Sequence, residues 1–395
     1  MFKLTKRSLF FIIIFSFSPI FADNTPEVKL KGGYEFQTVF LNNNNVDAQQ
    51  YVTGQRKNIG FNSSAHVNIE LLNYIQDKLE YGAKVGLETT SRNDRRLASV
   101  LYFLSDYGKF EVGNDKSANA KMKITSYSVG CATAGGWDMW PNLPRDKTKT
   151  SFAPNFGNFL DAKTRVSDKA EYSRKISYFT PKLYNFQIGV SYIPDSSNAG
   201  YSTVNKPVRQ HILARPLEHS FVITDGIAYG ISHEGSISTD LKVKSAVVGE
   251  RGKVTAYHKN GSRINTKFKN LSTYTIGSEI NYKKYAIAVS YANYMKSLTA
   301  SSVDKISKNS YIYGVGGRYK YNDKIAVSLN YFYSDYKKNT MSTTTLAADY
   351  KIISGVMSYG EISYYKTNAK YIDNNILNRE HTKGALLALG TKIEF

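Results

Sequence analysis

The chain of 395 residues is poor in cysteine, proline and tryptophan, with one Cys, 9 Pro and 2 Trp. The single cysteine, Cys131, excludes an intramolecular disulfide, so the fold depends on hydrogen bonding and packing, and we expect the thiol to be inert. One Cys and 6 His without metal-ligand spacing predict neither a metal site nor another cofactor. No segment after the N-terminal leader offers 18 or more consecutive apolar residues, which excludes a transmembrane helix.

The leader itself has the pattern of a secretory signal peptide. Three basic residues precede an apolar run from Leu9 to Phe17, and small Ala22 stands at the expected cleavage site. The run has about nine residues, against roughly 20 for a spanning helix. We therefore predict a removed leader at 1–22 and one domain at 23–395. Ile20 is an imperfect cleavage residue, so the site could shift slightly, and an uncleaved anchor is the alternative.

Basic residues dominate the charge of the chain. Its formal net charge is +20, and removal of the three basic residues of the leader leaves +17. This excess favours anionic partners such as lipopolysaccharide phosphates, anionic solutes or nucleic acid, and export argues against nucleic acid. His66, His211, His219 and His233 are scattered and form no pattern such as Gly-x-Ser-x-Gly, and no carboxylate pair stands out. We therefore predict that the protein is not an enzyme.

Aromatic residues, including 31 Tyr, are abundant, and they occur in runs where apolar and polar residues alternate. The terminal stretch GALLALGTKIEF shows the pattern: Leu387, Leu389, Ile393 and Phe395 fall on one face, with small or charged residues on the other. A period of two predicts a β-strand. Tyr clusters such as YIYGVGGRYKY, NYFYSDY and SYYK fall at strand ends.

The alternation recurs along the mature chain and predicts about sixteen strands. They are expected at 27–40, 58–71, 79–88, 97–105, 108–114, 171–180, 183–193, 219–232, 238–250, 273–283, 285–295, 309–321, 323–334, 344–352, 356–367 and 383–395. One short turn is expected at Pro181–Lys182, and long loops at 194–218, 251–272 and 368–382. An even number of strands with short turns on one side and long loops on the other is typical of a transmembrane antiparallel β-barrel.

Closure of such a barrel explains the ending of the chain. A bilayer excludes unpaired strand edges, so the last strand must pair with the first, and Phe395 would then lie at the lipid interface. Inward positions are mainly Gly, Ser, Ala, Asn and charged residues, which favours a water-filled lumen. A soluble β-sandwich or repeat protein would also alternate and is the competing interpretation.

Three stretches resemble the Gram-negative general porins, the sixteen-stranded trimeric family. YGKFEVGND is similar to the strand that leads into the third loop of that family. RKISYFTPKLYNFQIGVSYIPD is similar to the hairpin after this loop and is the most specific match. LGTKIEF resembles the terminal strand and final Phe that the outer-membrane assembly machinery reads.

The resemblance implies that loop three, residues 115–169, folds inward and narrows the lumen, where charges on the loop face charges on the wall. About fifty-five residues without strand pattern would otherwise argue against the predicted fold. A surface loop without a constriction is the alternative. Trp137 and Trp140 could pack this loop against the wall or simply anchor it.

Candidate constriction residues follow from the inward positions and the loop. On the wall they are Lys29, Lys31, Arg56 and Lys84. On the loop they are Asp115, Asp138, Asp146, Asp161, Lys121, Lys123 and Arg145. The sequence departs from the family in two ways: the wall has more Lys than Arg, and the loop itself is basic. A constriction with a net positive charge predicts a weak preference for anions.

Function and partners follow from the resemblance. It implies an outer-membrane homotrimer in contact with lipid and lipopolysaccharide that passes small hydrophilic solutes and ions. The apolar strand LASVLYFLS could face another protein copy. Because several loops are long, a surface adhesin or host-interaction barrel with little or no channel activity is the alternative function.

Overall fold

A computed structural model gives the fold of the chain and describes most of the predicted domain. The described residues are 25–43, 59–75, 78–90, 95–135, 164–166, 169–171, 173–196, 219–258, 263–299, 309–336, 339–373 and 376–395. The predicted leader lies outside them. Within these ranges no helix has the length and apolar character needed to cross a membrane.

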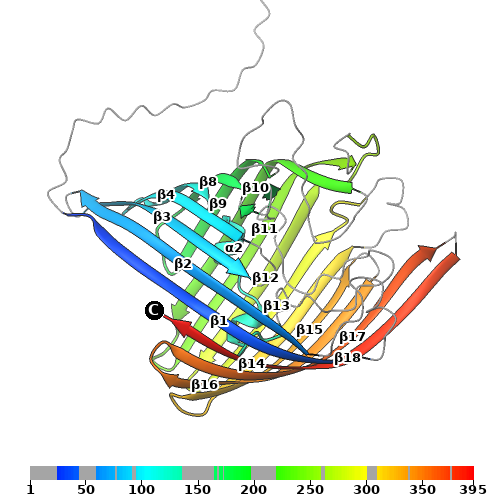
Figure 1. The fold of residues 1–395 in the computed structure, drawn as a ribbon. Coiled ribbons are helices and arrows are strands. Elements are labelled where there is room, and N and C mark those ends of the chain that lie inside the picture. The colour runs from blue at the N-terminus through cyan, green and yellow to red at the C-terminus, as the bar shows by residue number, and fades with distance from the viewer. Residues whose placement is uncertain are drawn as a thin grey trace, which may run out of the picture.

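Sixteen antiparallel strands form the wall of a closed barrel (Figure 1). They are β1 (Glu27–Asn43), β2 (Ile59–Ile75), β3 (Leu79–Thr90), β4 (Arg95–Ser105), β5 (Gly108–Asn114), β8 (Arg174–Phe179), β9 (Phe186–Asp195), β10 (His219–Ser236), β11 (Leu241–His258), β12 (Leu271–Tyr282), β13 (Tyr285–Met295), β14 (Ser310–Lys320), β15 (Ile325–Tyr336), β16 (Asn339–Ile353), β17 (Val356–Asp373) and β18 (Ile376–Glu394). The short strands β6 (Thr164–Val166) and β7 (Lys169–Glu171) pair with each other, and β7 runs beside β4. The predicted fold and strand number are confirmed.

The first and last strands close the barrel. β1 pairs with β2 on one side and with β18 on the other, from Gly33 opposite Glu394 to Asn43 opposite Gly384. The backbones of Gly32 and Phe395 then exchange two hydrogen bonds of 2.9 and 3.0 Å. Phe395 ring atoms lie 2.7 Å from the place where a Cβ on Gly32 would stand, so glycine makes room for the terminal ring. The prediction that the chain ends on a closing strand is confirmed.

Side chains alternate between the two faces of the wall, as strand geometry requires. Along β13 the outward side chains are large and exposed: Tyr285, Ile287, Val289 and Tyr291. Its inward side chains are small and buried: Ala286, Ala288, Ser290 and Ala292. An exposed apolar face around a closed sheet suits lipid and contradicts a soluble β-sandwich.

Tyrosines gather on the outer face near the ends of the strands. On β14 and β15, the Tyr313 and Tyr333 rings stack with centroids 5.1 Å apart. On β13 and β14, the Tyr285 and Tyr319 rings lie 5.0 Å apart near the opposite ends of the strands. These two levels correspond to the aromatic belts expected from the sequence.

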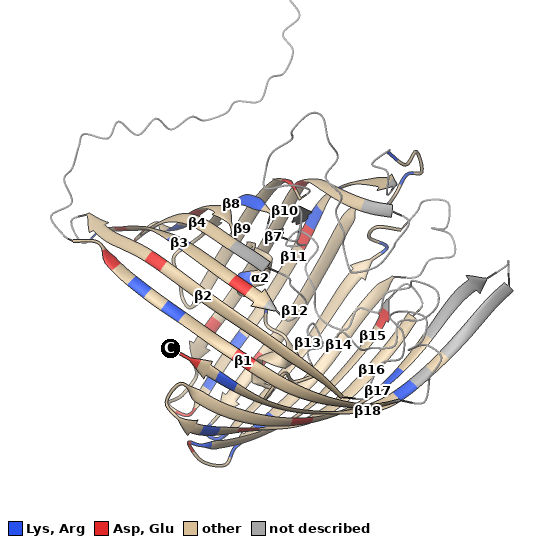
Figure 2. Cartoon of the chain, in the orientation of Figure 1, with Lys and Arg blue, Asp and Glu red and all other residues tan. Residues whose placement is uncertain are grey.

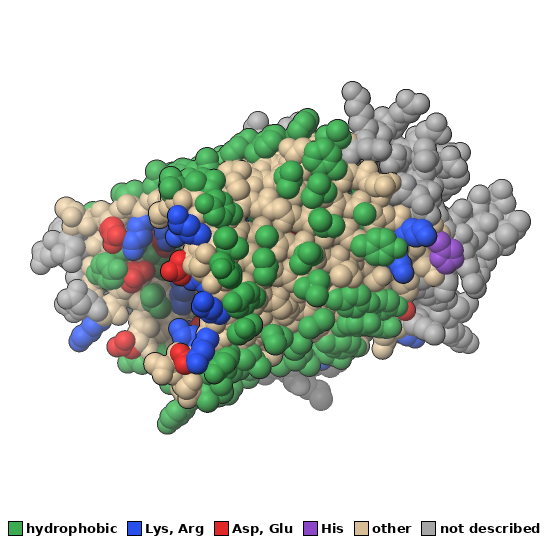
Figure 3. Space-filling model, turned by 90° about the horizontal axis from the view of Figure 1, so that it is seen from below, with side chains coloured by type: hydrophobic (Ala, Val, Ile, Leu, Met, Phe, Trp, Pro, Cys, Tyr) green, Lys and Arg blue, Asp and Glu red, His purple; other side chains and the backbone are tan. Residues whose placement is uncertain are grey.

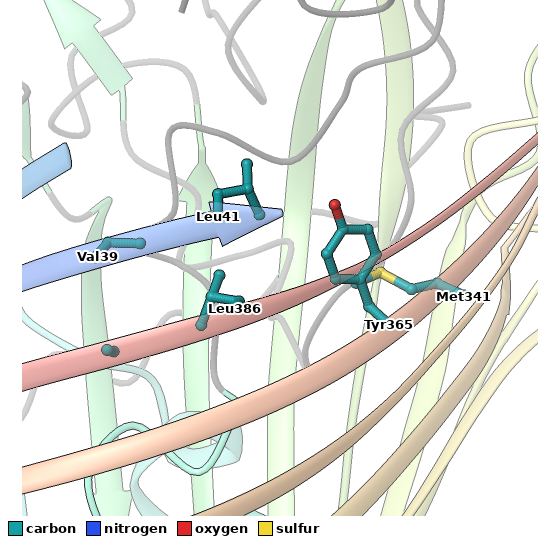
Figure 4. Packing of buried hydrophobic residues seen from close by; sticks show 6 residues of the cluster. Val39, Leu41, Met341, Tyr365 and Leu386 are labelled. Carbon is teal, nitrogen blue, oxygen red and sulfur yellow. The ribbon is translucent and has the colours of Figure 1, made fainter. Parts of the chain in front are cut away.

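One sector of the inner wall is apolar, which departs from the expectation of mainly Gly, Ser, Ala, Asn and charged residues at inward positions. The sector consists of Val39, Leu41, Met341, Tyr365, Leu386 and Ala388. These residues come from β1, β16, β17 and β18, and all are at most 8% exposed. Figure 4 shows Leu41, Leu386 and Tyr365 on neighbouring strands.

Two of the expected long loops are wrong in extent, because strand pairing continues past the alternating part of the sequence. β11 extends to His258, and Tyr257 bridges to Arg263, so strand occupies much of the expected loop 251–272. β17 and β18 pair as far as Asp373 opposite Ile376, within the expected loop 368–382. In the outer rungs of β11, Arg251 and Lys253 are exposed, whereas Val254 and Ala256 pack on the inner side, so the outward apolar pattern is lost although the ladder remains.

The hairpin between β8 and β9 also turns later than predicted. The turn lies at Tyr184 and Asn185, which have φ values of 49° and 67°, and Leu183 and Phe186 exchange two hydrogen bonds of 2.8 Å across it. Positive φ at both central residues is typical of a two-residue hairpin loop, and Asn tolerates it well. The predicted turn at Pro181–Lys182 is therefore wrong: the local Pro signal is overridden by the downstream Asn.

We expect the two faces of β2 to respond differently to an added charge. Val67→Arg places a guanidinium on the apolar outer face and should reduce the free energy of unfolding in lipid by about 2–4 kcal/mol. Its neighbour Asn68 faces the lumen, and Asn68→Arg should cost much less. Denaturant titration of the refolded variants in vesicles measures both, and equal losses would contradict the assignment of the faces.

Candidate functional site: the loop on the inner wall

The segment that follows β5 runs along the inside of the barrel. Residues 115–135 contain α2 (Ala118–Met122) and η1 (Ser126–Val129), each a single turn, and Figure 1 shows α2 within the barrel. Successive parts of the segment contact inward side chains of strands from β8 to β17. The described part of loop three therefore lies inside, as expected. Contrary to the expectation of a loop without regular structure, it contains α2 and η1.

The first contacts are made by α2. The backbone N–H of Ala118 donates to Ser191 Oγ on β9 at 2.8 Å. Met122 packs with Phe179 on β8 and with Ala246 and Val248 on β11. These contacts fix the beginning of the loop against one quarter of the wall.

The middle of the loop is held by β13 and β15. The N–H of Ser126 donates to Ser290 Oγ at 2.9 Å, and its carbonyl accepts from Asn330 Nδ2 at 3.0 Å. Tyr127 stacks on Phe332 with ring centroids 5.9 Å apart. Val129 packs against Ala286 and Ala288. Polar and apolar contacts thus alternate along the loop.

Carboxylates of the wall bind the last part of the loop. Asp349 on β16 accepts from the N–H of Ala132 at 2.8 Å. Glu361 on β17 accepts from both the N–H and the hydroxyl of Thr133, at 3.0 and 2.7 Å. The wall therefore supplies carboxyl oxygens as acceptors to a loop that supplies N–H and hydroxyl donors.

Two further side chains of the wall accept hydrogen bonds from the loop. Glu279 on β12 accepts from the Ser128 hydroxyl at 2.5 Å, and Ser328 on β15 accepts from the N–H of Cys131 at 2.8 Å. Burial, together with the nearby charge of Asp349, raises the pKa of the Cys131 thiol to about 11. The thiol is therefore protonated at neutral pH, in line with the expectation that it is inert.

Glycines on the wall leave space for the loop backbone. A Cβ on Gly277 would collide with the carbonyl group of Ile124, and one on Gly316 with the carbonyl oxygen of Ser126. On Gly314 it would meet the hydroxyl of Ser126. These positions explain why β12 and β14 carry inward glycines in otherwise regular strands.

A charged cluster lies where the loop leaves β5. Lys121 forms ion pairs with Glu111 and, at 2.9 Å, with Asp115, and Lys109 lies 3.0 Å from Glu111. Lys175 donates to the backbone carbonyl of Asp115. Burial opposes ionisation of Asp115 and Lys121, but their mutual attraction outweighs it, so the pKa of Asp115 is lowered and that of Lys121 is raised. Both groups are therefore charged at neutral pH.

A recess of about 370 Å³ opens beside this cluster. Lys109, Lys121 and Lys182 line it together with one carboxylate, Glu111, and Phe179 and Met122 supply apolar surface. Figure 2 shows that charged residues of both signs occur along the strands near α2. The recess is therefore lined mainly by apolar surface, and its charged side chains include more ammonium groups than carboxylates.

The predicted site residues lie in several different parts of the structure. Asp115 and Lys121 meet in the charged cluster, and after Lys121 the positive charge of the wall residue Lys84 makes a smaller contribution to the lowered pKa of Asp115. Lys29 and Lys84 flank Glu70 in one row across β1, β2 and β3. Lys31 is exposed on β1, and Lys123 follows α2. Outside the described residues lie Arg56, Asp138, Asp146, Asp161, Arg145, Trp137 and Trp140.

The sequence interpretation missed the residues that hold the loop. They are Ser191, Glu279, Ser290, Ser328, Asn330, Asp349 and Glu361. The sequence signal that could have revealed them is a polar residue between two apolar residues of the outer face, in a strand that follows the loop. This signal marks inward positions but does not show which of them a distant loop contacts.

A closed barrel with an apolar outer wall, and with a loop bound to its polar inner wall, defines a porin-type membrane barrel. The model of the Gram-negative porin family matches residues 13–370, and the chain belongs to this family. The family and the fold place the protein in the outer membrane.

Relatives and solved structures agree with this assignment. An uncharacterized protein of Rickettsia bellii is 31% identical, over 96% of this chain and 95% of that protein. One of Rickettsia conorii is 30% identical with the same coverage. An anion-selective porin from Comamonas acidovorans (TM-score 0.59, 12% identity) covers 94% of this chain and all of its own. The trimer form of OmpT from Vibrio cholerae (TM-score 0.57, 15% identity) has the same coverage, and both show the shared fold.

We expect Glu361→Ala to release the end of the described loop. The loss of a charged acceptor of two hydrogen bonds should speed hydrogen exchange of the Ala132 and Thr133 amides by about one to two orders of magnitude. Glu70→Ala, which removes an inward carboxylate from β2, is the matched control. Unchanged exchange in Glu361→Ala would contradict the proposed anchoring.

Gly277→Ala should displace the loop from β12. The added methyl meets the Ile124 carbonyl, and such overpacking costs about 1–3 kcal/mol. We expect a lower unfolding temperature, followed by circular dichroism in detergent. Gly317 faces open space, so Gly317→Ala should leave the unfolding temperature within about one degree of wild type. Equal effects of the two variants would exclude a contact between loop and Gly277.

Proposed function

We propose that the mature chain, beginning near residue 23 after removal of the leader, forms a water-filled channel for passive diffusion of small hydrophilic solutes and ions. The observation that carries the proposal is the combination of a polar inner wall with a loop bound along it, which narrows the lumen without requiring a separate plug. Figure 3 shows side chains of both charges gathered at the left end of the barrel.

A weak preference for anions is the second part of the proposal. In three ion pairs of the inner wall and loop, the ammonium side chain is more exposed than the carboxylate. Lys109 is 37% exposed and Glu111 6%, Lys121 25% and Asp115 19%, and Lys392 25% and Glu35 15%. Solutes in the lumen therefore meet the positive member of each pair first, and the excess of basic residues in the whole chain has the same sign.

In the ion pairs at the strand ends, the carboxylate is about as exposed as the ammonium groups. Glu234 is 50% exposed, and Lys182 and Lys244, which contact it at 2.9 and 3.0 Å, are 55% and 41% exposed. The Glu234 carboxylate therefore partly offsets the positive field at the opening of the barrel. A weak preference, and not a strict selection, follows from this balance.

We further propose that the protein is a homotrimer surrounded by outer-membrane lipid and lipopolysaccharide. A trimer form of the fold neighbour from Vibrio cholerae supports this assembly. On β4, Leu101 lies on the outer face and is 45% exposed, which is compatible with a contact to another copy. The adhesin alternative loses part of its basis, because strand replaces most of the expected loop 368–382.

Conductance of the refolded mature protein in a planar bilayer under a KCl gradient tests the proposal. We expect discrete current steps and a reversal potential on the chloride side. Lys109→Gln removes an exposed lumen charge and should shift the potential towards the potassium side. Arg174→Gln removes a charge from the outer face and should leave it unchanged.

The other outcomes separate the two parts of the proposal. A wild-type potential on the potassium side would keep the channel and overturn the anion preference. Complete absence of steps, from protein shown to be folded by circular dichroism, would overturn the channel and favour a closed adhesin-like barrel.

A further inference from the structure

The inner wall from β12 to β17 carries acidic and basic side chains in equal number. The inward charged residues whose side chains the structure describes in this sector are Glu279, Arg318, Lys320, Asp349, Lys351 and Glu361. Three carboxylates therefore accompany three cations, and their formal charges cancel. If all six groups were equally exposed to the lumen, this sector would give no ion preference.

The loop covers the acidic members of the sector. Glu279, Asp349 and Glu361 each accept a hydrogen bond from loop residues 128–133, at distances of 2.5–3.0 Å. In the part of the chain that the structure describes, no hydrogen bond or ion pair joins the loop to one of the three cations. The segment that makes the contacts, 124–135, has no charged side chain of its own. The loop is thus an uncharged cover that lies over the carboxylates.

Exposure to the lumen differs between the two kinds of charge. Two of the three carboxylates, Glu361 and Glu279, are 1% and 9% exposed. Two of the three cations, Lys320 and Lys351, are exposed. The remaining acid and the remaining base are both half-buried. The positive charges of the sector are therefore more accessible than the negative ones.

Ion pairing distinguishes the cations from one another. Lys320 pairs at 2.8 Å with Asp323 in the adjoining turn. Neither Arg318 nor Lys351 forms an ion pair with a described residue. The guanidinium and ammonium groups of these two residues are therefore available to anions in the lumen.

Covering a carboxylate reduces its effect on a passing ion through distance and screening. The interaction between two unit charges falls to less than half when their separation grows from about 4 to about 10 Å. Dissolved salt screens it further, over a length of about 8–10 Å. A layer of loop between a carboxylate and a solute therefore weakens the acidic half of the sector and leaves the basic half in force.

We propose that the uncharged segment 124–135 determines the ion preference of this sector by covering its carboxylates, which leaves Arg318 and Lys351 as the charges that solutes meet. Arg318 and Lys351 then determine specificity, and Ser128 and Thr133 are positioning residues that hold the cover in place. The inference rests on the proposed channel and adds the residues of this sector that favour anions.

Reversal potentials of refolded mature protein in a planar bilayer under a KCl gradient test exposed and covered charges separately. Arg318→Gln should lower the chloride-to-potassium permeability ratio about twofold, as expected for one screened charge beside the ion path. Glu361→Gln keeps an oxygen acceptor for Thr133 and removes a charge of opposite sign. Because this charge is covered, the ratio should rise by a clearly smaller factor. Arg251→Gln, at an exposed position of β11 on the outer face, is the matched control for Arg318→Gln and should leave the ratio unchanged.

Displacement of the loop by an uncharged substitution gives a second test. A Cβ on Gly316 would collide with the carbonyl oxygen of Ser126, so Gly316→Val should move the loop away from the wall. Exposure of the carboxylates should then lower the permeability ratio, although no charge has changed. Gly317→Val, which points into open space, is the matched control. Faster hydrogen exchange of the Ala132 and Thr133 amides, with an unchanged circular dichroism spectrum, reports the displacement in a folded barrel.

Two results would overturn the inference. One is a rise of the ratio in Glu361→Gln as large as the fall in Arg318→Gln, because covered carboxylates would then act on ions as strongly as exposed cations. The other is an unchanged ratio in Gly316→Val while the loop amides exchange rapidly. Current steps in wild type together with either result would leave the channel proposal standing. Absence of steps in wild type would overturn the channel and this inference with it.

Discussion

Closure of the sheet between β1 and β18 is the interaction on which the rest of the structure depends. In lipid, a backbone N–H or C=O without a partner is expensive, so no wall strand can keep an open edge. The eleven rungs from Gly33 to Asn43, followed by the two hydrogen bonds of Phe395, remove that edge. Once the wall is closed, each strand must present one face to lipid and the other to the interior.

The requirement that backbone groups have hydrogen-bond partners also determines how the loop is held. The wall strands use their backbone groups for each other. Several N–H groups of the loop bond to carbonyl groups within the loop, and others find their acceptors among side chains of the wall. Ser191, Ser290 and Ser328 accept from the N–H groups of residues 118, 126 and 131, and Asp349 and Glu361 accept from those of residues 132 and 133. Hydroxyl and carboxylate acceptors replace the carbonyl groups that a neighbouring strand would otherwise offer.

The sequence predicts the wall well and the inside of the barrel poorly, for a physical reason. Lipid requires an apolar residue at every second position of a wall strand. The sequence therefore predicts the observed ends of strands such as 108–114 and 285–295. Where that pressure stops, as beyond Glu250 on β11, charged residues such as Arg251 and Lys253 are exposed, and the predicted end of the strand fails. Glu361 looks like any inward polar residue, because its partner Thr133 lies 228 positions away in the sequence.

The positions of the loop partners along the chain have a consequence for assembly. The wall side chains that accept from the N–H groups of Ala118, Ser126, Cys131, Ala132 and Thr133 all lie C-terminal to the loop, from Ser191 on β9 to Glu361 on β17. An N-terminal intermediate that ends before β9 contains the loop but none of these acceptors. These contacts between the loop and the wall can therefore form only after the late strands arrive, in the last stage of biogenesis.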